Sequence, residues 1–468
     1  MKTVTTAERE AAGRAARERT KRSSHRQLGQ LARDPLELLM IGTEGLVPKL
    51  VPLRHGRMLA SPFAFFVGSP ILQAHDLSVA PNTGMVIPVC GDAHLLNFGA
   101  FATPERQLVF DIKDFDEVSP APWEWDLKRL ATSFVLAARQ MRYSRGAAET
   151  LVMSAVGEYR DRMRQYAESG ALELWYEKST FDRMIETALT PEARRLIRRG
   201  MEKAASRTQE SALDKLAQYD GGQWTIRDAP LSTFHVPPAN TLFEPDDAWF
   251  DVGHWRQQIV KLYEGYRKTL SHDRRELLGH FDVQDLAFRM VGADVGARRL
   301  MLLAVDHRGE PLFLQIKDAR RSAIARFFRA PVLKHEGERI VEGQRLMQAA
   351  GDILAGWSTA PSGRHVYVRQ LRDMKLSAHI ELLDSALLAD YARLCGWSLV
   401  RAHARAGNAA IEIAAYIGRG DPFAEALAGY AFAYADQVER DYEVFANAVR
   451  HGVLPVCSEG DIAADLGL

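Results

Sequence analysis

Apolar and polar residues follow two different periods along this chain, and each period predicts a different kind of element. Val86-Ile87-Pro88-Val89 is a short apolar run that predicts a buried strand, and Gly91-Asp92 predicts a turn behind it. The apolar run at 107–112 predicts a second strand. From residue 123 onward, apolar side chains recur on one helical face and predict a long helix. Because acidic residues follow both strands, we expect the two strands to deliver carboxylates to one edge.

The pattern changes at 281–318, where short apolar runs are separated by turn residues. It predicts three antiparallel strands, with a tight turn at Gly292–Gly296 between the first two and Lys317 on the third. A helix is predicted at 338–355 and a further strand at 365–371. The rest of the chain is predicted to be mostly helical, and one helix at 387–406 carries His403 and ends at Gly407. We interpret His403 as a packed or hydrogen-bonded side chain.

Two segments show no such period. Residues 49–69 mix Pro, Gly and aromatic residues with Arg54 and Arg57, which predicts an extended segment lying across a core. Residues 7–33 are rich in Ala, Arg and Glu and predict a basic helix, which we interpret as a solvated or partly disordered arm. The basic residues between 194 and 207 are interpreted as a solvated helix face.

The composition argues against several classes of protein. Of 468 residues, 47% are hydrophobic and 26% are charged, as in globular proteins of two or three domains. Lys plus Arg equals Asp plus Glu, at 60 each, so the net charge gives no argument for a nucleic-acid or membrane partner. Three scattered cysteines and the lack of an apolar run of ~18 residues predict a protein of the reducing cytoplasm. No apolar segment follows a basic start, so we expect no secretory signal.

Oxygen-bearing side chains gather between residues 92 and 116. Asn97 lies five residues after Asp92, and Asp114 follows the second predicted strand. Carboxylate and amide oxygens bind divalent cations, and a carboxylate beside a hydroxyl can act as a base. Asp111 is a rival of Asp114 for a metal ion, since it also lies near the strand end. Turns capped by Asp and Asn would place the same residue types there without any site.

The stretch Cys90-Gly91-Asp92 with Asn97, followed by Asp114-Phe115-Asp116-Glu117, resembles the catalytic loop of aminoglycoside phosphotransferases and, more distantly, of protein kinases. Those enzymes carry His-Gly-Asp, then Asn five residues on, then an Ile-Asp-Phe/Trp-Asp strand end; Cys90 replaces the His here. The resemblance implies that Asp92 is the base or orienting group for the attacking hydroxyl. It also implies that Asn97 and Asp114 bind Mg²⁺ on ATP.

The resemblance extends to the three strands at 281–318, which are similar to a kinase small lobe. It implies that the turn at Gly292 and Gly296 covers the nucleotide phosphates and that Lys317 pairs with them. A helix Glu would then pair with Lys317, with Glu342 as our first choice and Glu338 as the second. An exposed helix Glu is the alternative for each. Asp126, near the start of the long helix, would brace the catalytic loop by accepting backbone hydrogen bonds.

Over nearly its whole length the chain is also similar to a bacterial family known as domain of unknown function 2252, and the matching segments are 49–69, 91–133, 314–319, 339–351, 366–375 and 401–407. That family usually has Arg where this chain has Val67. Together the resemblances imply an α+β, two-lobed protein kinase-like fold, circularly permuted, with a predominantly helical large lobe. The expected parts are a helical arm at 1–60, a large-lobe part with the catalytic loop at 61–275, a small antiparallel lobe at 276–375, and helices completing the large lobe at 376–468.

We therefore expect an ATP- and Mg²⁺-dependent phosphotransferase that acts on an unidentified small-molecule or protein hydroxyl, with nucleotidyl transfer left open. One alternative is a nucleotide-binding or scaffold protein whose site has decayed, as Cys90 and Val67 suggest. A weaker alternative is a metal-dependent phosphoesterase, whose cluster would comprise Asp92, His94, Asp111, Asp114 and Asp116.

Overall fold

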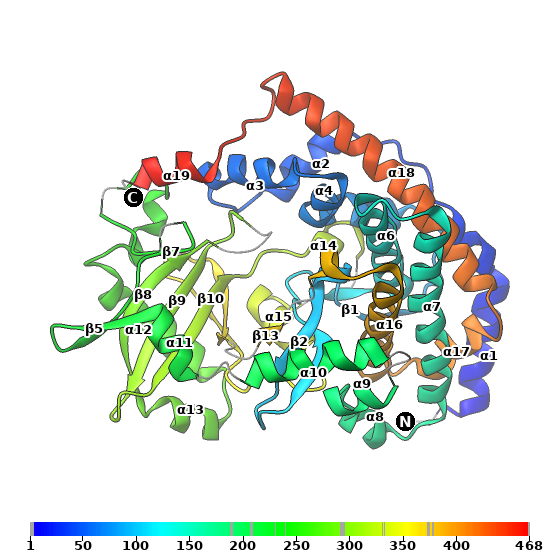
Figure 1. The fold of residues 1–468 in the computed structure, drawn as a ribbon, viewed down its shortest axis with the longest axis horizontal. Coiled ribbons are helices and arrows are strands. Elements are labelled where there is room, and N and C mark those ends of the chain that lie inside the picture. The colour runs from blue at the N-terminus through cyan, green and yellow to red at the C-terminus, as the bar shows by residue number, and fades with distance from the viewer. Residues whose placement is uncertain are drawn as a thin grey trace.

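The computed structural model describes residues 4–187, 191–205, 209–229, 231–238, 240–290, 295–329, 331, 333–371, 375–376 and 379–466. Helices and strands lie largely in different parts of it (Figure 1). The α-helices are α1 (Thr6–Arg19), α2 (Pro35–Gly42), α3 (Val51–Met58), α4 (Pro62–Gly68), α5 (Pro70–Ser78), α6 (Glu124–Gln140), α7 (Arg145–Glu168), α8 (Ala171–Tyr176), α9 (Phe181–Thr187), α10 (Pro191–Ala205), α11 (Gln209–Leu216), α12 (Trp255–Lys268), α13 (His272–Leu278), α14 (Ala323–Phe327), α15 (Glu336–Met347), α16 (Ser385–Gly407), α17 (Ala410–Ile417), α18 (Pro422–Arg450) and α19 (Glu459–Leu466).

The strands are β1 (Val86–Val89), β2 (Phe98–Ala102), β3 (Leu108–Ile112), β4 (Ser119–Pro122), β5 (Ala217–Asp220), β6 (Gln223–Ile226), β7 (Thr233–Phe234), β8 (Phe281–Arg289), β9 (Arg299–Asp306), β10 (Pro311–Asp318), β11 (Gly356–Thr359), β12 (His365–Gln370) and β13 (Lys375–Leu376). Each strand pairing that the structure describes is antiparallel. Antiparallel sheets beside a separate set of helices make the fold α+β, as expected. In the described residues, no helix combines the length and the apolar character needed to cross a membrane.

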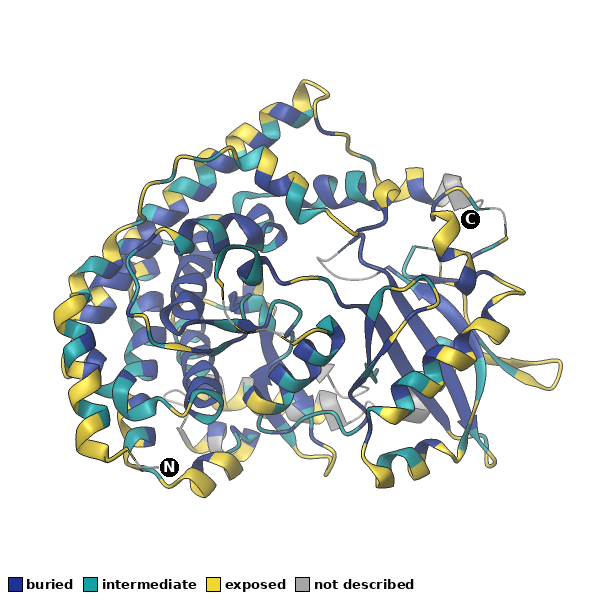
Figure 2. Cartoon of the chain, turned by 180° about the vertical axis from the view of Figure 1, so that it is seen from behind, coloured by how far each residue is buried: buried dark blue, intermediate teal, exposed yellow. Residues whose placement is uncertain are grey.

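The largest sheet has the strand order β11-β12-β10-β9-β8-β7. Its central strands β8, β9 and β10 confirm the three predicted antiparallel strands, and β12 confirms the strand predicted at 365–371. Every residue of β10 is buried, and Figure 2 shows the same for much of β8 and β9. Apolar side chains from one face of this sheet form a core with Ile259 and Leu262 of α12. The sheet is therefore a rigid support for the residues on its other face.

A second and larger core lies among the helices. Helix α16 runs against α7 and also beside β1, far from it in sequence (Figure 1). We expected this neighbourhood of β1 and the helix carrying His403, and it is confirmed. Gly407 permits the close approach, because a side chain there would overlap Ile87. The left-handed residue that ends the helix is Asn408, not Gly407 as predicted.

Strands β1 and β3 both form where the apolar runs predict them, but they belong to different small sheets. Strand β1 pairs with β4, whereas β3 lies in the order β13-β2-β3. The expectation that one sheet edge presents both sets of carboxylates is therefore wrong. The loops that follow the two strands meet instead through a backbone hydrogen bond of 2.8 Å from the Lys113 N–H to the Asn97 carbonyl.

Residues 49–69 are helical, which corrects the prediction of an extended segment. Helices α3 and α4 occupy most of it, and Pro52 and Pro62 stand in their first turns. A proline in the first turn costs no hydrogen bond, because the first N–H groups of a helix have no intrahelical acceptor. Ser61 caps α4 by accepting a hydrogen bond from the Ala64 N–H. The prolines thus start helices rather than prevent them.

Helix α1 is packed on the helical part, so the interpretation of 7–33 as a solvated arm is wrong. Ala16 is buried, and Gly13 lies against the backbone of α17 at Glu412. Arg9 forms an ion pair of 3.0 Å with Glu412, and Arg17 donates to the Tyr416 carbonyl at 2.7 Å. The basic residues serve as contacts between helices. By contrast, the described side chains of the basic run on α10 are exposed at 194, 195, 198 and 199, as predicted.

Candidate active site

The loop after β1 is fixed by one buried carboxylate. Asp126 of α6 accepts hydrogen bonds from the backbone N–H groups of Cys90 and Gly91, at 2.8 and 2.9 Å. His403 Nε2 lies 3.1 Å from the same carboxylate although 277 residues separate the two, and its Nδ1 lies 2.9 Å from the Tyr159 hydroxyl. Asp126 therefore braces the loop as the resemblance implied, and His403 is a hydrogen-bonded, buried side chain as predicted.

Gly91 gives this loop its shape. Its φ of +84° lies in the left-handed region, and a Cβ at this position would overlap the backbone carbonyl of Glu117. The glycine therefore lets the segment after β3 pass directly over the turn that presents Asp92.

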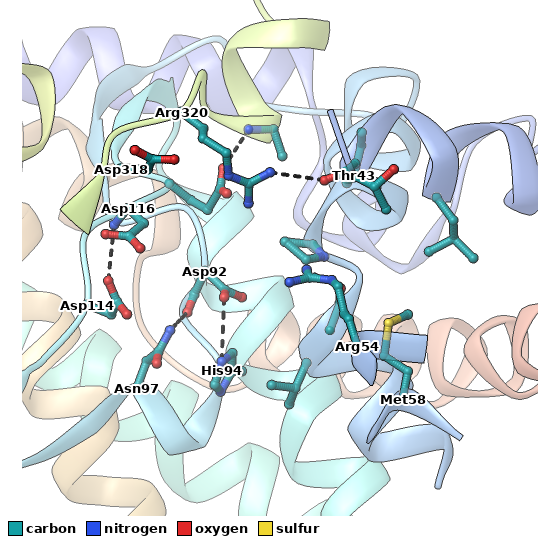
Figure 3. A pocket seen from close by; sticks show the side chains of 18 of the residues that line it. Thr43, Arg54, Met58, Asp92, His94, Asn97, Asp114, Asp116, Asp318 and Arg320 are labelled. Carbon is teal, nitrogen blue, oxygen red and sulfur yellow. Dashed lines mark hydrogen bonds and ion pairs between the residues drawn. The ribbon is translucent and has the colours of Figure 1, made fainter. Parts of the chain in front are cut away.

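Asp92 points into the space between the sheet and the helices (Figure 3). Its carboxylate forms an ion pair with Arg129 of α6, and its Oδ2 lies 3.5 Å from His94 Nε2. Burial alone would raise the pKa of Asp92, but Arg129 and His94 outweigh burial and lower the pKa to about 2. The carboxylate is thus ionised at neutral pH, and so low a pKa suits orienting a hydroxyl better than accepting its proton.

Asn97 and Asp114 lie on the same side of Asp92 (Figure 3). The Asn97 side-chain N–H donates to the Asp92 carbonyl at 2.7 Å, which leaves the amide oxygen as the atom able to bind a cation. Burial would raise the pKa of Asp114, but Lys317 and Arg369 outweigh it and hold the pKa well below its usual range. An amide oxygen and an ionised carboxylate are donors that Mg²⁺ accepts, so the residues present fit the implied ion.

Lys317 of β10 meets this acidic loop from the sheet. Its Nζ lies 3.7 Å from Asp114 Oδ2 and pairs more closely with Asp116, although 201 residues separate Lys317 from Asp116. Tyr367 of β12 donates to the other oxygen of Asp116 at 2.7 Å. Burial would lower the pKa of Lys317, but Asp114 and Asp116 outweigh burial and raise it. Lys317 and Asp114 are therefore well within the span of a triphosphate, as predicted.

The expected partner of Lys317 on the following helix is wrong. Glu342 accepts a hydrogen bond of 2.6 Å from Arg345 on its own helix α15, which matches the alternative of a surface helix Glu. In the part of the chain that the structure describes, the ion pairs of Lys317 go to Asp114 and Asp116, so neither Glu342 nor Glu338 pairs with it.

The two glycines predicted to cover phosphates have different outcomes. Gly296 adopts a φ of +105°, lies against Leu46 and accepts a hydrogen bond of 2.8 Å from the Val47 N–H. Gly292 lies outside the described residues. The phosphate-covering role of this turn stays a prediction.

Asp111 is a structural residue. It is 1% exposed, and its Oδ1 forms an ion pair of 2.6 Å with Arg401, which is 0% exposed. Its Oδ2 accepts a hydrogen bond of 3.1 Å from the Ala349 N–H. Asp111 does not line the cavity, whereas Asp114 does. Among the described residues, no group of three or more His, Cys, Asp and Glu side chains is arranged to hold a metal ion, so the five-residue phosphoesterase cluster is not assembled.

The carboxylates lie at a cavity of about 520 Å³ between the sheet and the helices. Asp92, Asn97, Asp114 and Asp116 line one part of it. The sequence did not single out most of the cationic wall, which comprises Arg54, Arg299, Arg320, Arg321, Arg326 and Arg369. These arginines come from segments more than 300 residues apart in the sequence, and no spacing rule connects them. Val67 also lines the cavity.

Comparison with known proteins gives one match. A family model described as "Uncharacterized protein conserved in bacteria (DUF2252)" matches residues 46–448. No curated protein and no solved structure matches the chain.

Proposed function

This chain belongs to the bacterial DUF2252 family, and we propose that it is an ATP- and Mg²⁺-dependent phosphotransferase with a two-lobed, kinase-like fold. One observation carries the proposal: Lys317 on the sheet lies 3.7 Å from Asp114 on the loop after β3, at a cavity that Asp92 and Asn97 also line. Phosphoryl transfer needs this combination of a phosphate-binding cation, metal-binding oxygens and a carboxylate near the acceptor.

Each residue has a distinct task in this proposal. Asn97 and Asp114 hold Mg²⁺, which neutralises charge on the phosphates. Lys317 and the neighbouring Arg369 contact the phosphates from the sheet. Asp92 holds the acceptor hydroxyl in position for attack, a task that requires a fixed carboxylate more than a basic one. The bonds that Asp126 accepts from the loop keep Asp92 in place.

The position of α16 supports the circular permutation. In the phosphotransferases that the loop resembles, a helix of this kind directly precedes the catalytic loop. Here α16 follows that loop by about 300 residues, yet it lies beside β1 and places His403 on Asp126. We propose that the catalytic part of the large lobe comes first, the small lobe next and the completing helices last. Chain ends at the surface make such a rearrangement physically acceptable.

Binding of Mg-ATP tests the proposal. A ligand that binds the folded state alone stabilises it by RT ln(1 + [L]/Kd), ~2.7 kcal/mol at a hundredfold excess over Kd. We expect a clear rise in melting temperature with millimolar Mg-ATP, and no rise for Asp114→Ala. The exposed Asp282, on β8 outside the cavity, provides the control variant Asp282→Ala, which keeps the rise. If the parent shows neither binding heat nor a melting shift, the proposal fails.

A second candidate is a nucleotide-binding protein whose catalysis has decayed. The ion pair between Arg129 and Asp92 favours it, because it lowers the pKa of the carboxylate and so weakens it as a base. In that case the chain binds Mg-ATP but transfers no phosphate to any of a broad panel of hydroxyl compounds. Detection of a phosphorylated product by mass spectrometry rejects this candidate.

A further inference from the structure

The carboxylates at the cavity are already paired with cations that stand behind its wall. Asp92 pairs with Arg129, while Asp114 and Asp116 share Lys317. Neither Arg129 nor Lys317 lines the cavity. Asp318, a further acid of the wall, has Arg298 at 3.6 Å, and Arg298 also lies outside the lining.

The six arginines of the wall therefore add positive charge that the acids of the cavity do not need for themselves. They form two groups. Arg299 on β9 and Arg369 on β12 project from the sheet near Asp114, where the proposed phosphates of ATP bind. The second group, which we call the outer arginines, comprises Arg54 of α3 and Arg320, Arg321 and Arg326 at the end of β10 and on α14.

Two outer arginines lie on the acceptor side of Asp92. In Figure 3, Arg54 lies on the side of Asp92 away from Asp114, and Arg320 reaches across the cavity towards Thr43. Arg320 donates to the Gly42 carbonyl at 3.1 Å, and Arg54 donates to the Gly68 carbonyl at 2.8 Å. These bonds to neutral carbonyl oxygens hold the guanidinium groups in place but do not cancel their charge.

We propose that the acceptor is itself an anion, and that the outer arginines bind its phosphate or carboxylate group while Asp92 holds its hydroxyl. This assignment rests on the proposed function and adds the charge class of the substrate. Guanidinium groups bind phosphate and carboxylate through paired N–H donors, and several of them around one cavity exclude a polycation by repulsion. Two anions, the nucleotide and the acceptor, then occupy separate groups of arginines in one cavity.

The test uses the full chain saturated with Mg²⁺ and a non-hydrolysable ATP analogue. Inorganic phosphate and succinate are titrated as probes for the two anionic groups, and spermidine is the oppositely charged control, each followed by calorimetry and melting temperature. We expect phosphate or succinate to bind in addition to the analogue, with an affinity that falls as salt rises. Spermidine should show no binding at this site.

Variants locate the subsite. Arg54 is 8% exposed and holds two backbone carbonyls, so its replacement endangers folding. The exposed Arg321 and the half-buried Arg326 avoid this problem, and the double variant Arg321→Gln/Arg326→Gln should weaken anion binding by about tenfold or more. Analogue affinity should change by less than about twofold. Arg308→Gln, in the exposed turn between β9 and β10, is the matched control.

The outcomes separate this inference from the function on which it rests. If phosphate and succinate bind only in competition with the analogue, or bind the double variant as well as the parent, there is no acceptor subsite at the outer arginines. Tighter binding of spermidine than of either anion also overturns the proposal. If the analogue does not bind but phosphate does, and the double variant loses it, the anion site stands while the phosphotransferase proposal fails.

Discussion

Replacing Asp111 and Asp114 one at a time distinguishes a structural carboxylate from a metal ligand three residues away. Both acids follow or end β3, and both carry one negative charge. They differ in surroundings: Asp111 is buried against Arg401, whereas the side chain of Asp114 is 34% exposed at the cavity. Asp111→Ala should therefore damage the fold, and Asp114→Ala should damage ligand binding.

The magnitudes follow from the partners that each variant leaves behind. Asp111→Ala leaves Arg401 charged and 0% exposed, a situation that costs about 3–5 kcal/mol. The Ala349 N–H also loses its acceptor, at about 1 kcal/mol more. Because total stabilities are about 5–15 kcal/mol, this loss is severe. Asp114→Ala leaves Lys317 paired with Asp116, so its cost in the absence of ligand should be about 0–1 kcal/mol.

Urea unfolding with and without Mg-ATP measures both effects. We expect the Asp111→Ala midpoint to fall sharply, and any folded protein that remains to keep its gain from Mg-ATP. Asp114→Ala should unfold near the parent midpoint and gain nothing. The double variant Asp111→Ala/Arg401→Met should recover part of the lost stability, because it removes the unpaired charge.

One result refutes this reasoning. If Asp111→Ala unfolds like the parent and loses the gain from Mg-ATP while Asp114→Ala keeps it, the metal ligand is Asp111. The correspondence with the phosphotransferase loop would then be shifted by three residues.

Three further predictions address the loop and the sheet. Asp92→Asn should leave Mg-ATP affinity nearly unchanged in a calorimetric titration and, once an acceptor is identified, slow turnover by ~10²–10⁴; unchanged turnover would show that Asp92 does not act on the acceptor. Gly91→Ala should lower the melting temperature and weaken Mg-ATP binding, because the new Cβ overlaps the Glu117 carbonyl; a parent-like melt and affinity would contradict this. The hydrogen bond of His235 to Asp285 raises the pKa of the His to about 9 against burial, so protonated His235 stabilises the fold fully below pH 6.5 and this contribution is lost as the pH rises through about 9; melting curves of His235→Gln against pH should lack that decline, and a decline equal to the parent's would rule it out.

The local parts of the site could be predicted from the sequence because short-range chemistry determines them. The apolar run before Asp92 forms β1, the run before Asp114 forms β3, and the alternation from 281 to 318 forms three paired strands. Asn97 folds back on the Asp92 carbonyl within five residues, a distance over which residue type and spacing govern conformation. Helix α3 was missed, because the same prolines that interrupt a strand also start a helix.

Tertiary structure alone decided which of these side chains meet. Asp111 and Asp114 have the same charge and nearly the same position in the sequence, and only Arg401, 290 residues from Asp111, turns one of them into a core residue. Lys317 pairs with Asp116 rather than with Glu342, because strand register rather than helix spacing places it there. The arginine wall likewise joins segments from Arg54 to Arg369. Each of these contacts depends on long-range packing, and the free energy of that packing belongs to the folded chain as a whole and not to any segment read by itself.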